Sequence, residues 1–121
     1  MKLSKTNKKF IYLISPNKIK SEDFYLNLAL VLNTRKVSFF QLRLKKETTI
    51  NKLIIGKKIK KICKKYKVKF LINDDPLLAK KLNADGCHLG QKDMNLIKAR
   101  KILKNKIIGV TCHNSIILAK K

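Results

Sequence analysis

Residues 70–76 read FLINDDP and residues 85–93 read DGCHLGQKD, and in each a short apolar strand runs directly into acidic and amide side chains. The chain has 30 Lys and Arg against only 7 Asp and Glu, so carboxylates are scarce. Three of them, Asp74, Asp75 and Asp93, follow the ends of these two strands. Because ligands bind at the carboxyl ends of strands in parallel α/β folds, we expect a binding site here.

Strand and helix patterns alternate outward from these two stretches. Apolar runs predict strands over residues 10–14, 37–45, 68–72, 86–89 and 107–111. Capping residues predict helices that begin at Ser21, at Thr48 or Thr49, at Asp75-Pro76, at Asp93 or Asn95, and at Ser115. This alternation predicts an α/β fold of parallel (β/α) units, with the strands side by side in sequence order.

The predicted strands form the first five of a TIM (β/α)8 barrel, in a single domain over residues 1–121. Such a barrel typically takes ~250 residues, so five strands leave it incomplete. We therefore expect a fragment, a truncated product or an unusual open sheet. Its last edge, over residues 107–110, would be apolar and unpaired, which invites self-association.

The net charge of +23 comes almost entirely from lysine, because only three of the basic residues are arginine. One explanation of the lysine excess is a compositional bias shared by a whole proteome, with the lysines on solvated helix faces. The other is a surface that binds nucleic acid. In both cases the positive charge should attract anionic ligands. The odd number of cysteines, with no C-x-x-C pair, argues against a disulfide framework. No stretch is long enough to span a membrane and none resembles a signal peptide, so we expect a cytoplasmic protein.

Asp74 and Asp93 are candidate ligands for a hard divalent cation, which we take to be Mg²⁺. Mg²⁺ commonly uses one or two carboxylates, with water and substrate phosphate completing its octahedron. Helix capping is the alternative, and it accounts well for Asp75 and acceptably for Asp93. It accounts less well for Asp74, because Asp75 already supplies a cap.

Residues 41–45 alternate strictly between polar and apolar side chains. Gln41, Arg43 and Lys45 fall on one face of the predicted strand, and Leu42 and Leu44 fall on the other. The polar row is either a strand end emerging into solvent or a set of donors aimed at an anion, and the alternation leaves both open.

Two Cys-His dipeptides, at residues 87–88 and 112–113, suggest a soft-metal site at first sight. Neighbouring residues of a strand point to opposite faces, so neither pair can bind one ion jointly. Buried free cysteines are the better interpretation, and His113, just past a strand, is a weak candidate for ligand contact.

Four blocks of the sequence, in order, resemble those of thiamine-phosphate synthases: QLRLK at 41–45, LIND at 71–74, ADGCHLGQKD at 84–93 and IIGVTCH at 107–113. The third block is the most distinctive. The resemblance covers nearly the whole chain but only the N-terminal part of the family's length. It implies a (β/α)8-barrel transferase of thiamine biosynthesis. Such enzymes join 4-amino-2-methyl-5-(diphosphooxymethyl)pyrimidine to thiazole phosphate and release diphosphate.

The resemblance also assigns roles to single residues. It implies that Asp74 and Asp93 coordinate Mg²⁺, that Thr111 replaces a substrate-binding Ser, and that the pyrimidine diphosphate is bound by Gln41, Arg43, Lys45 and Asn73. It names no catalytic nucleophile, and the catalytic residue stays unknown. The sequence departs from the family at Leu44, Asp75 and Cys112.

The resemblance implies that the thiazole-phosphate loops follow the fifth strand, so we expect the chain alone to be inactive. Two alternatives stay open: a thiazole tautomerase-like relative of the same superfamily, and a non-enzymatic basic domain that binds nucleic acid. The last rests on charge alone and lacks any known module pattern. We therefore expect small-molecule partners rather than a membrane or a nucleic acid.

Overall fold

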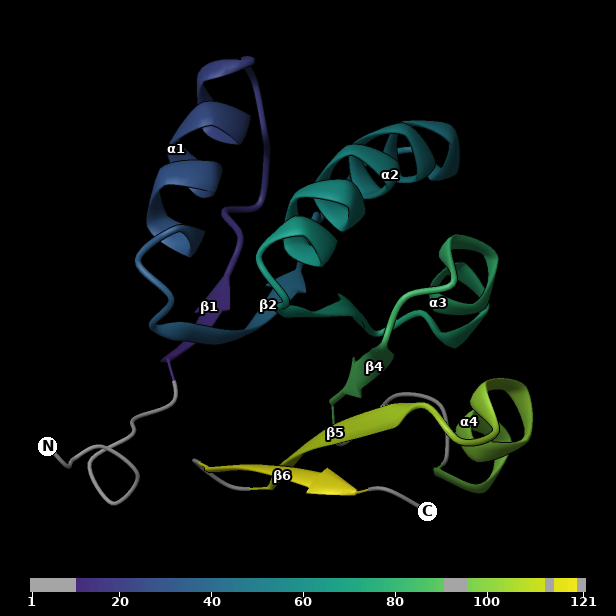
Figure 1. The fold of residues 1–121 in the computed structure, drawn as a ribbon. Helices are drawn as coiled ribbons and strands as arrows, with labels where there is room; N and C mark the ends of the chain where they lie inside the picture. Colours follow the sequence, from purple (N-terminus) through teal and green to yellow (C-terminus); the bar gives the residue numbers. More distant parts are fainter. Residues whose placement is uncertain (1–10, 91–95, 113–114, 120–121) are drawn as a thin grey trace, which may run out of the picture.

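Six strands form one curved sheet, and four helices lie along its outer face (Figure 1). The structure is a computed structural model that describes residues 11–90, 96–112 and 115–119. The strands are β1 (Ile11–Ile14), β2 (Val37–Leu42), β3 (Lys69–Asn73), β4 (Gly86–Leu89), β5 (Ile107–Cys112) and β6 (Ser115–Ala119). The helices are α1 (Asp23–Leu32), α2 (Thr49–Lys65), α3 (Pro76–Leu82) and α4 (Leu96–Leu103). None of these described helices is both long enough and apolar enough to cross a bilayer.

Strands β1 to β5 are parallel and neighbour one another in sequence order, as predicted. The helix expected from Ser115 is wrong, because residues 115–119 form β6, antiparallel to β5. Residues 116–118 read Ile-Ile-Leu, which suits a strand, and pairing with β5 satisfies backbone groups at the edge of the sheet. The prediction of an unpaired edge at β5 is therefore wrong too. The edge through which we expected the chain to self-associate is paired with β6.

Local capping explains where two helices begin. Thr48 accepts a hydrogen bond from the backbone N–H of Asn51 at 3.1 Å, and α2 follows. Asp75 accepts one from the N–H of Leu78 at 3.0 Å, and Pro76 opens α3 as predicted.

Helix α1 differs from the prediction at its first turn. The sequence pointed to Ser21 as the cap, but α1 begins at Asp23 and its N-cap is Glu22, in helical conformation and without a side-chain capping bond. The carbonyl of Ser21 accepts from the N–H of Phe24 at 3.3 Å, so the backbone already turns before the helix starts.

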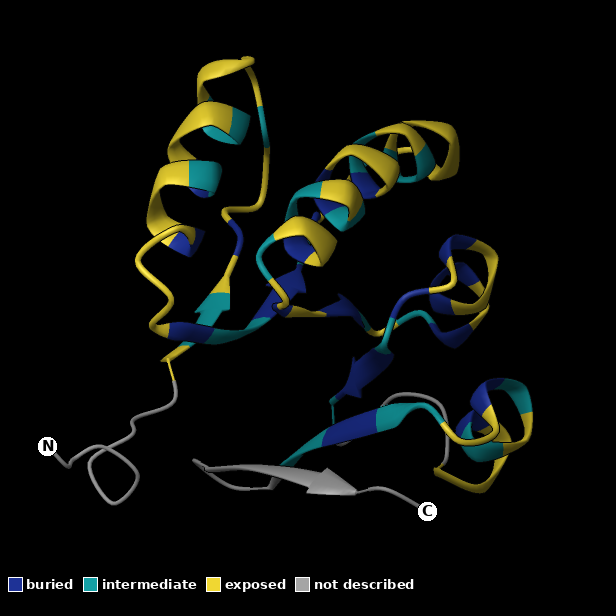
Figure 2. Ribbon diagram, viewed as in Figure 1, coloured by how far each residue is buried: buried dark blue, intermediate teal, exposed yellow. Residues whose placement is uncertain are grey.

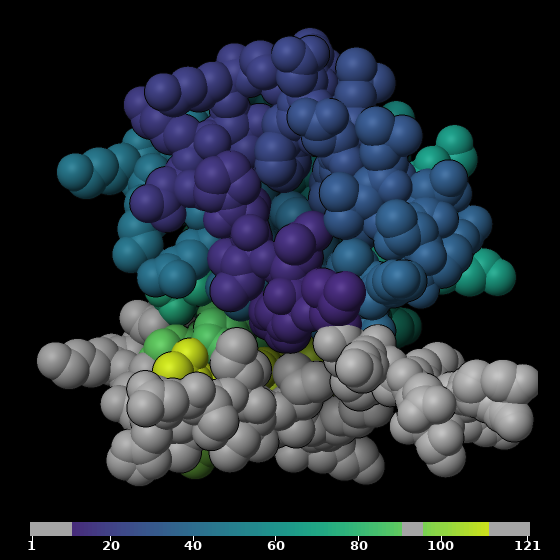
Figure 3. Space-filling view, turned by 90° about the vertical axis from the view of Figure 1, so that its left-hand side faces the viewer, coloured from purple at the N-terminus to yellow at the C-terminus, as the bar shows by residue number. Residues whose placement is uncertain are grey.

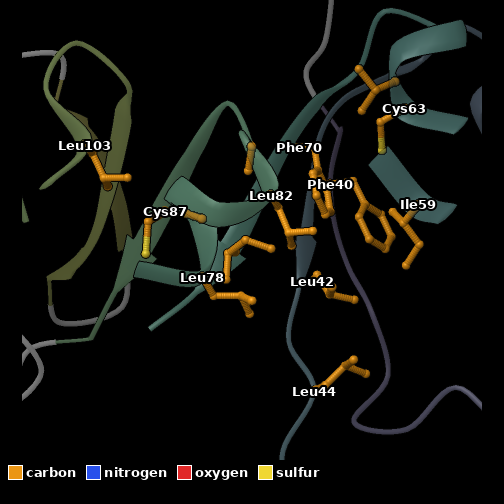
Figure 4. Close-up of a cluster of buried hydrophobic side chains, with 14 of the residues drawn as sticks. Phe40, Leu42, Leu44, Ile59, Cys63, Phe70, Leu78, Leu82, Cys87 and Leu103 are labelled. Atoms are coloured by element: carbon orange, nitrogen blue, oxygen red, sulfur yellow. The ribbon is translucent and has the colours of Figure 1, made fainter. Parts of the chain in front are cut away.

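Alternate residues of each parallel strand face the helices and build the core. They include Phe40 and Leu42 of β2, Phe70 and Ile72 of β3, and Cys87 of β4, which are all buried with apolar side chains of the helices (Figure 4). In Figure 2 the buried stripes of the helices accordingly lie toward the sheet and the exposed ones away from it. The intervening strand residues face the concave side, where polar side chains gather.

The other edge of the sheet is β1, whose only described pairing is with β2. Figure 3 shows this side of the molecule, where residues of β1 and the segment leading to α1 form the surface. Ile11 and Ile14 are each 42% exposed there.

Candidate functional site

The carboxyl ends of β2 to β5 place polar side chains on the concave face of the sheet. Register pairs Leu42 with Ile72, Asn73 with His88, and His88 with Gly109. Because Phe70 and Ile72 pack toward the helices, the alternation of β3 turns Asn73 to the opposite face. The same alternation turns His88 away from Cys87.

Asn73 and Asp74 form a hydrogen-bonded unit at the end of β3. The Nδ2 of Asn73 donates to Oδ2 of Asp74 at 3.1 Å, and the N–H of Gly90 donates to Oδ1 of Asp74 at 3.2 Å. The backbone N–H of Asp74 donates to the carbonyl of His88 at 2.7 Å. The exposed Asp74 carboxylate is therefore held over the ends of both β3 and β4.

The backbone of Asp74 is left-handed, with a φ of 61°. Asp is among the few residues with a side chain that adopt this conformation readily. The turn ends β3 and directs the chain into α3, so Asp75 is free to cap that helix while Asp74 faces the site. Asp75 caps α3, whereas the neighbouring Asp74 carboxylate accepts from Asn73 and Gly90.

Gln41 is 2% exposed and lies against β1. Its Nε2 donates to the Tyr12 hydroxyl at 3.0 Å, and burial raises the pKa of Tyr12, which keeps the phenol protonated. The carbonyl of Gln41 accepts from the N–H of Ser15 at 2.9 Å, which joins the ends of β1 and β2.

Arg43 lies one residue beyond the end of β2, which stops at Leu42 rather than at Lys45 as predicted. Its backbone N–H donates to Oγ of Ser15 at 2.9 Å. Its Nε is buried, and within the described residues this atom has no hydrogen-bond partner. A buried guanidinium donor of this kind is suited to an anion. Lys45 is exposed further along the same loop.

Thr111 of β5 and His88 of β4 are in contact across the two strands. The Nε2 of His88 lies 2.6 Å from Oγ1 of Thr111, and His88 is 6% exposed. Cys87 points to the core instead, which confirms that this Cys-His pair is split between two faces.

The structure places Gln41, Asn73, Asp74 and Thr111 at or just beyond the carboxyl-terminal parts of β2, β3 and β5. Asn73 and Asp74 touch one another, and Gln41 and Thr111 are held by Tyr12 and His88. Asp93 and His113 lie outside the described residues. Sequence reasoning did not single out Tyr12, Ser15 and His88 as partners of the predicted site residues; strand alternation predicted only that Cys87 and His88 point to opposite faces.

The described residues contain no group of three or more His, Cys, Asp or Glu side chains arranged to hold a metal. Asp74 nevertheless offers a carboxylate at the strand end. Asn73 uses its Nδ2 toward Asp74, so that bond does not consume its amide oxygen. These are oxygen donors, which fit a hard cation such as Mg²⁺ rather than a soft one.

Comparison with known proteins finds similarity along the chain. The family model described as thiamine monophosphate synthase matches residues 11–120. A thiamine-phosphate synthase of Pelagibacter ubique (strain HTCC1062) is 84% identical over 121 residues, which are 100% of this chain and 58% of that protein. One from Clostridium acetobutylicum is 42% identical over 106 residues, 86% of this chain and 50% of the relative. The chain thus spans between half and three fifths of the length of these relatives.

A solved structure gives the same result for the fold. The thiamine phosphate pyrophosphorylase from Pyrococcus furiosus superposes with a TM-score of 0.73 at 29% identity, over 88% of this chain and 50% of the other. The likeness confirms that the five parallel strands and their helices form part of a TIM-barrel-like fold.

Proposed function

Because this chain belongs to the thiamine monophosphate synthase family, we propose that its concave face binds the pyrimidine diphosphate substrate of a thiamine-phosphate synthase. In the proposed reaction the bond between the pyrimidine methylene carbon and the diphosphate oxygen breaks, and diphosphate leaves with the electron pair. The ring nitrogen of thiazole phosphate then supplies the electron pair for the new carbon–nitrogen bond. This makes the protein a transferase that uses no protein nucleophile.

The observation that carries the proposal is that three polar residues of the family's pattern lie in the carboxyl-terminal parts of β2, β3 and β5, each side chain with a hydrogen-bond partner. Tyr12 holds Gln41, Asp74 holds Asn73, and His88 contacts Thr111. Side chains fixed in this way lose less conformational freedom when a ligand binds. We assign Gln41, Asn73 and Thr111 to substrate contact on this basis.

Arg43 and Lys45 supply the positive charge that the proposed diphosphate requires. The buried Nε of Arg43 is a directional donor, and the exposed ammonium of Lys45 is a point charge. Their positive charge stabilises the negative charge that develops on the leaving diphosphate, which lowers the barrier to bond cleavage.

Asp74, together with Asp93, would hold Mg²⁺. When bound there, the cation would supply further charge neutralisation to the diphosphate. The support for this assignment is the exposed Asp74 carboxylate, locked by Gly90 and Asn73 at the mouth of the concave face. The chain has few other carboxylates to draw on.

Calorimetric titration of the chain with the pyrimidine diphosphate, with Mg²⁺ and with EDTA, tests both parts of the proposal. We expect tight binding only with Mg²⁺. Asp74→Asn keeps the side-chain shape, tolerates the left-handed backbone and removes the charge, so it should lose at least tenfold in Mg²⁺-dependent affinity. Asp23→Asn, at an exposed carboxylate on α1, is the control and should bind like the parent. Equal affinity with Mg²⁺ and with EDTA contradicts the metal assignment, and no binding in either condition contradicts the substrate assignment.

A further inference from the structure

A groove lined with lysine lies between α2 and α3, at the amino ends of the strands. It consists of two adjoining cavities of about 500 and about 460 Å³, which share Lys60, Lys64 and Asn83. We propose that this basic groove binds a short oligophosphate, a linear chain of three or more phosphoryl groups. Lys69 opens β3 and Asp85 precedes β4, so the groove is at the opposite end of the strands from the site described above and does not depend on its function.

The lysines of the groove come from three neighbouring segments. Helix α2 contributes Lys57, Lys60, Lys61 and Lys64, a spacing that sets them along one side of the helix. At 1.5 Å per residue this row extends for ~10 Å. Lys67 and Lys69 continue it into β3, and Lys81 of α3 lies across the groove. The charges are therefore distributed along a line, as they are in a chain of phosphates.

Very little negative charge offsets these lysines. Among the described residues, Asp85 is the one carboxylate that lines the two cavities, and its Oδ2 already accepts a hydrogen bond from the N–H of Phe70 at 2.8 Å. The ion pair found among the described residues is Lys58 with Glu22, outside the groove. The lysines consequently repel one another and create a positive potential that a multiply charged anion would relieve.

The lining also indicates which anion fits best. Cavities of this size fall within the range of small-molecule pockets, which measure ~300–1,000 Å³. The described lining of the groove has no arginine for bidentate contacts to bases, and the aromatic ring in it, Phe70, is only 1% exposed and cannot stack on a base. Lysine ammonium groups bind phosphate as point charges. These features favour an oligophosphate over a nucleic acid.

Inorganic tripolyphosphate in EDTA is the probe. The groove variant is the triple substitution Lys60→Gln, Lys61→Gln and Lys64→Gln, which removes three charges without lowering helix propensity. The control is Lys20→Gln, Lys36→Gln and Lys101→Gln, which removes the same charge from exposed positions elsewhere. Circular dichroism establishes that both are folded, and calorimetry at physiological salt measures binding.

We expect the groove variant to lose at least tenfold in tripolyphosphate affinity and the control less than twofold. Equal loss in both variants would mean that only the overall charge attracts the anion, and would overturn the proposal. A comparable loss in Lys45→Gln would assign the anion to the concave face instead. Displacement of tripolyphosphate by a single-stranded oligonucleotide at equal phosphate concentration would identify the groove as a nucleic-acid site and would equally refute the proposal.

Discussion

Gly86 marks a close approach between β4 and β5, and replacing it tests the packing of the sheet. It pairs with Leu71 of β3 and Ile107 of β5. A Cβ built on Gly86 would lie 2.1 Å from the carbonyl oxygen of Ile107 and 2.7 Å from its carbonyl carbon. Both are backbone atoms, so they cannot move aside unless β4 and β5 separate.

From this geometry we expect Gly86→Ala to destabilise the chain by about 3–4 kcal/mol. Overpacking in a close-packed interior costs ~1–3 kcal/mol, and the strain here falls at the upper end because no side chain can rotate away. Weakening one ladder hydrogen bond adds ~1 kcal/mol. For a urea dependence of ~2 kcal/mol per molar, the unfolding midpoint should fall by about 2 M.

Gly56→Ala is the matched control. Its added Cβ would lie 2.5 Å from Cδ1 of Leu82, which is the end of a flexible side chain. Replacing glycine by alanine in a helix gains ~1 kcal/mol, which offsets the cost of moving Leu82, so stability should change by less than ~1 kcal/mol. If urea denaturation followed by circular dichroism finds Gly86→Ala no less stable than Gly56→Ala, the reasoning from close approach is refuted.

Three further changes probe other contacts. Asp85→Ala leaves the N–H of Phe70 without its acceptor and should cost ~1–3 kcal/mol by urea denaturation, whereas Asp85→Asn, which keeps an acceptor oxygen, should cost less. Thr48→Ala removes the α2 cap and should cost ~1 kcal/mol, which thermal melts against the neighbouring Thr49→Ala would detect; equal melting of the two variants would contradict it. Burial, helped by Asp85, raises the pKa of Cys63 to about 12. The folded chain thus keeps the thiol proton longer than the unfolded chain, and stability should fall as pH rises from ~8.5 toward 12. Cys63→Ala should flatten that decline, and an unchanged slope would exclude the thiol as its source.

The strand and helix pattern was predictable where local chemistry and tertiary packing agree. Asp75 and Pro76 specify the start of α3 whatever surrounds them, and the structure begins the helix there. Ser115 shows the opposite case, because a plausible cap was overridden by the pairing of residues 115–119 with β5. A single sequence contains no direct signal for such a partner.

The sequence predicted a set of candidate site residues but not the contacts that hold them. Strand alternation predicted that Gln41 and Arg43 share a face, but β2 ends at Leu42 and the strand pattern does not extend to Arg43. The predicted strand end did point to Asn73 and Asp74, which lie where β3 ends. The contacts that fix them were not foreseeable, because Tyr12 and Gln41 are far apart in the sequence. The left-handed turn at Asp74 likewise depends on its bond to the neighbouring strand, which residue type alone does not reveal.

The order of strands in the sheet, which repeats their order along the chain, bears on how the protein is made. Each of the strands β2 to β6 pairs with the strand that directly precedes it in the chain, so no pairing has to wait for a segment made much later. A chain leaving the ribosome can add one strand and one helix at a time to a sheet that already exists. At ~5–20 residues per second, an apolar strand such as β3 would wait only a few seconds for its next neighbour to be synthesised. Because the sheet grows in the order of synthesis, the unpaired edge of β3 is accessible to other chains only for a short time.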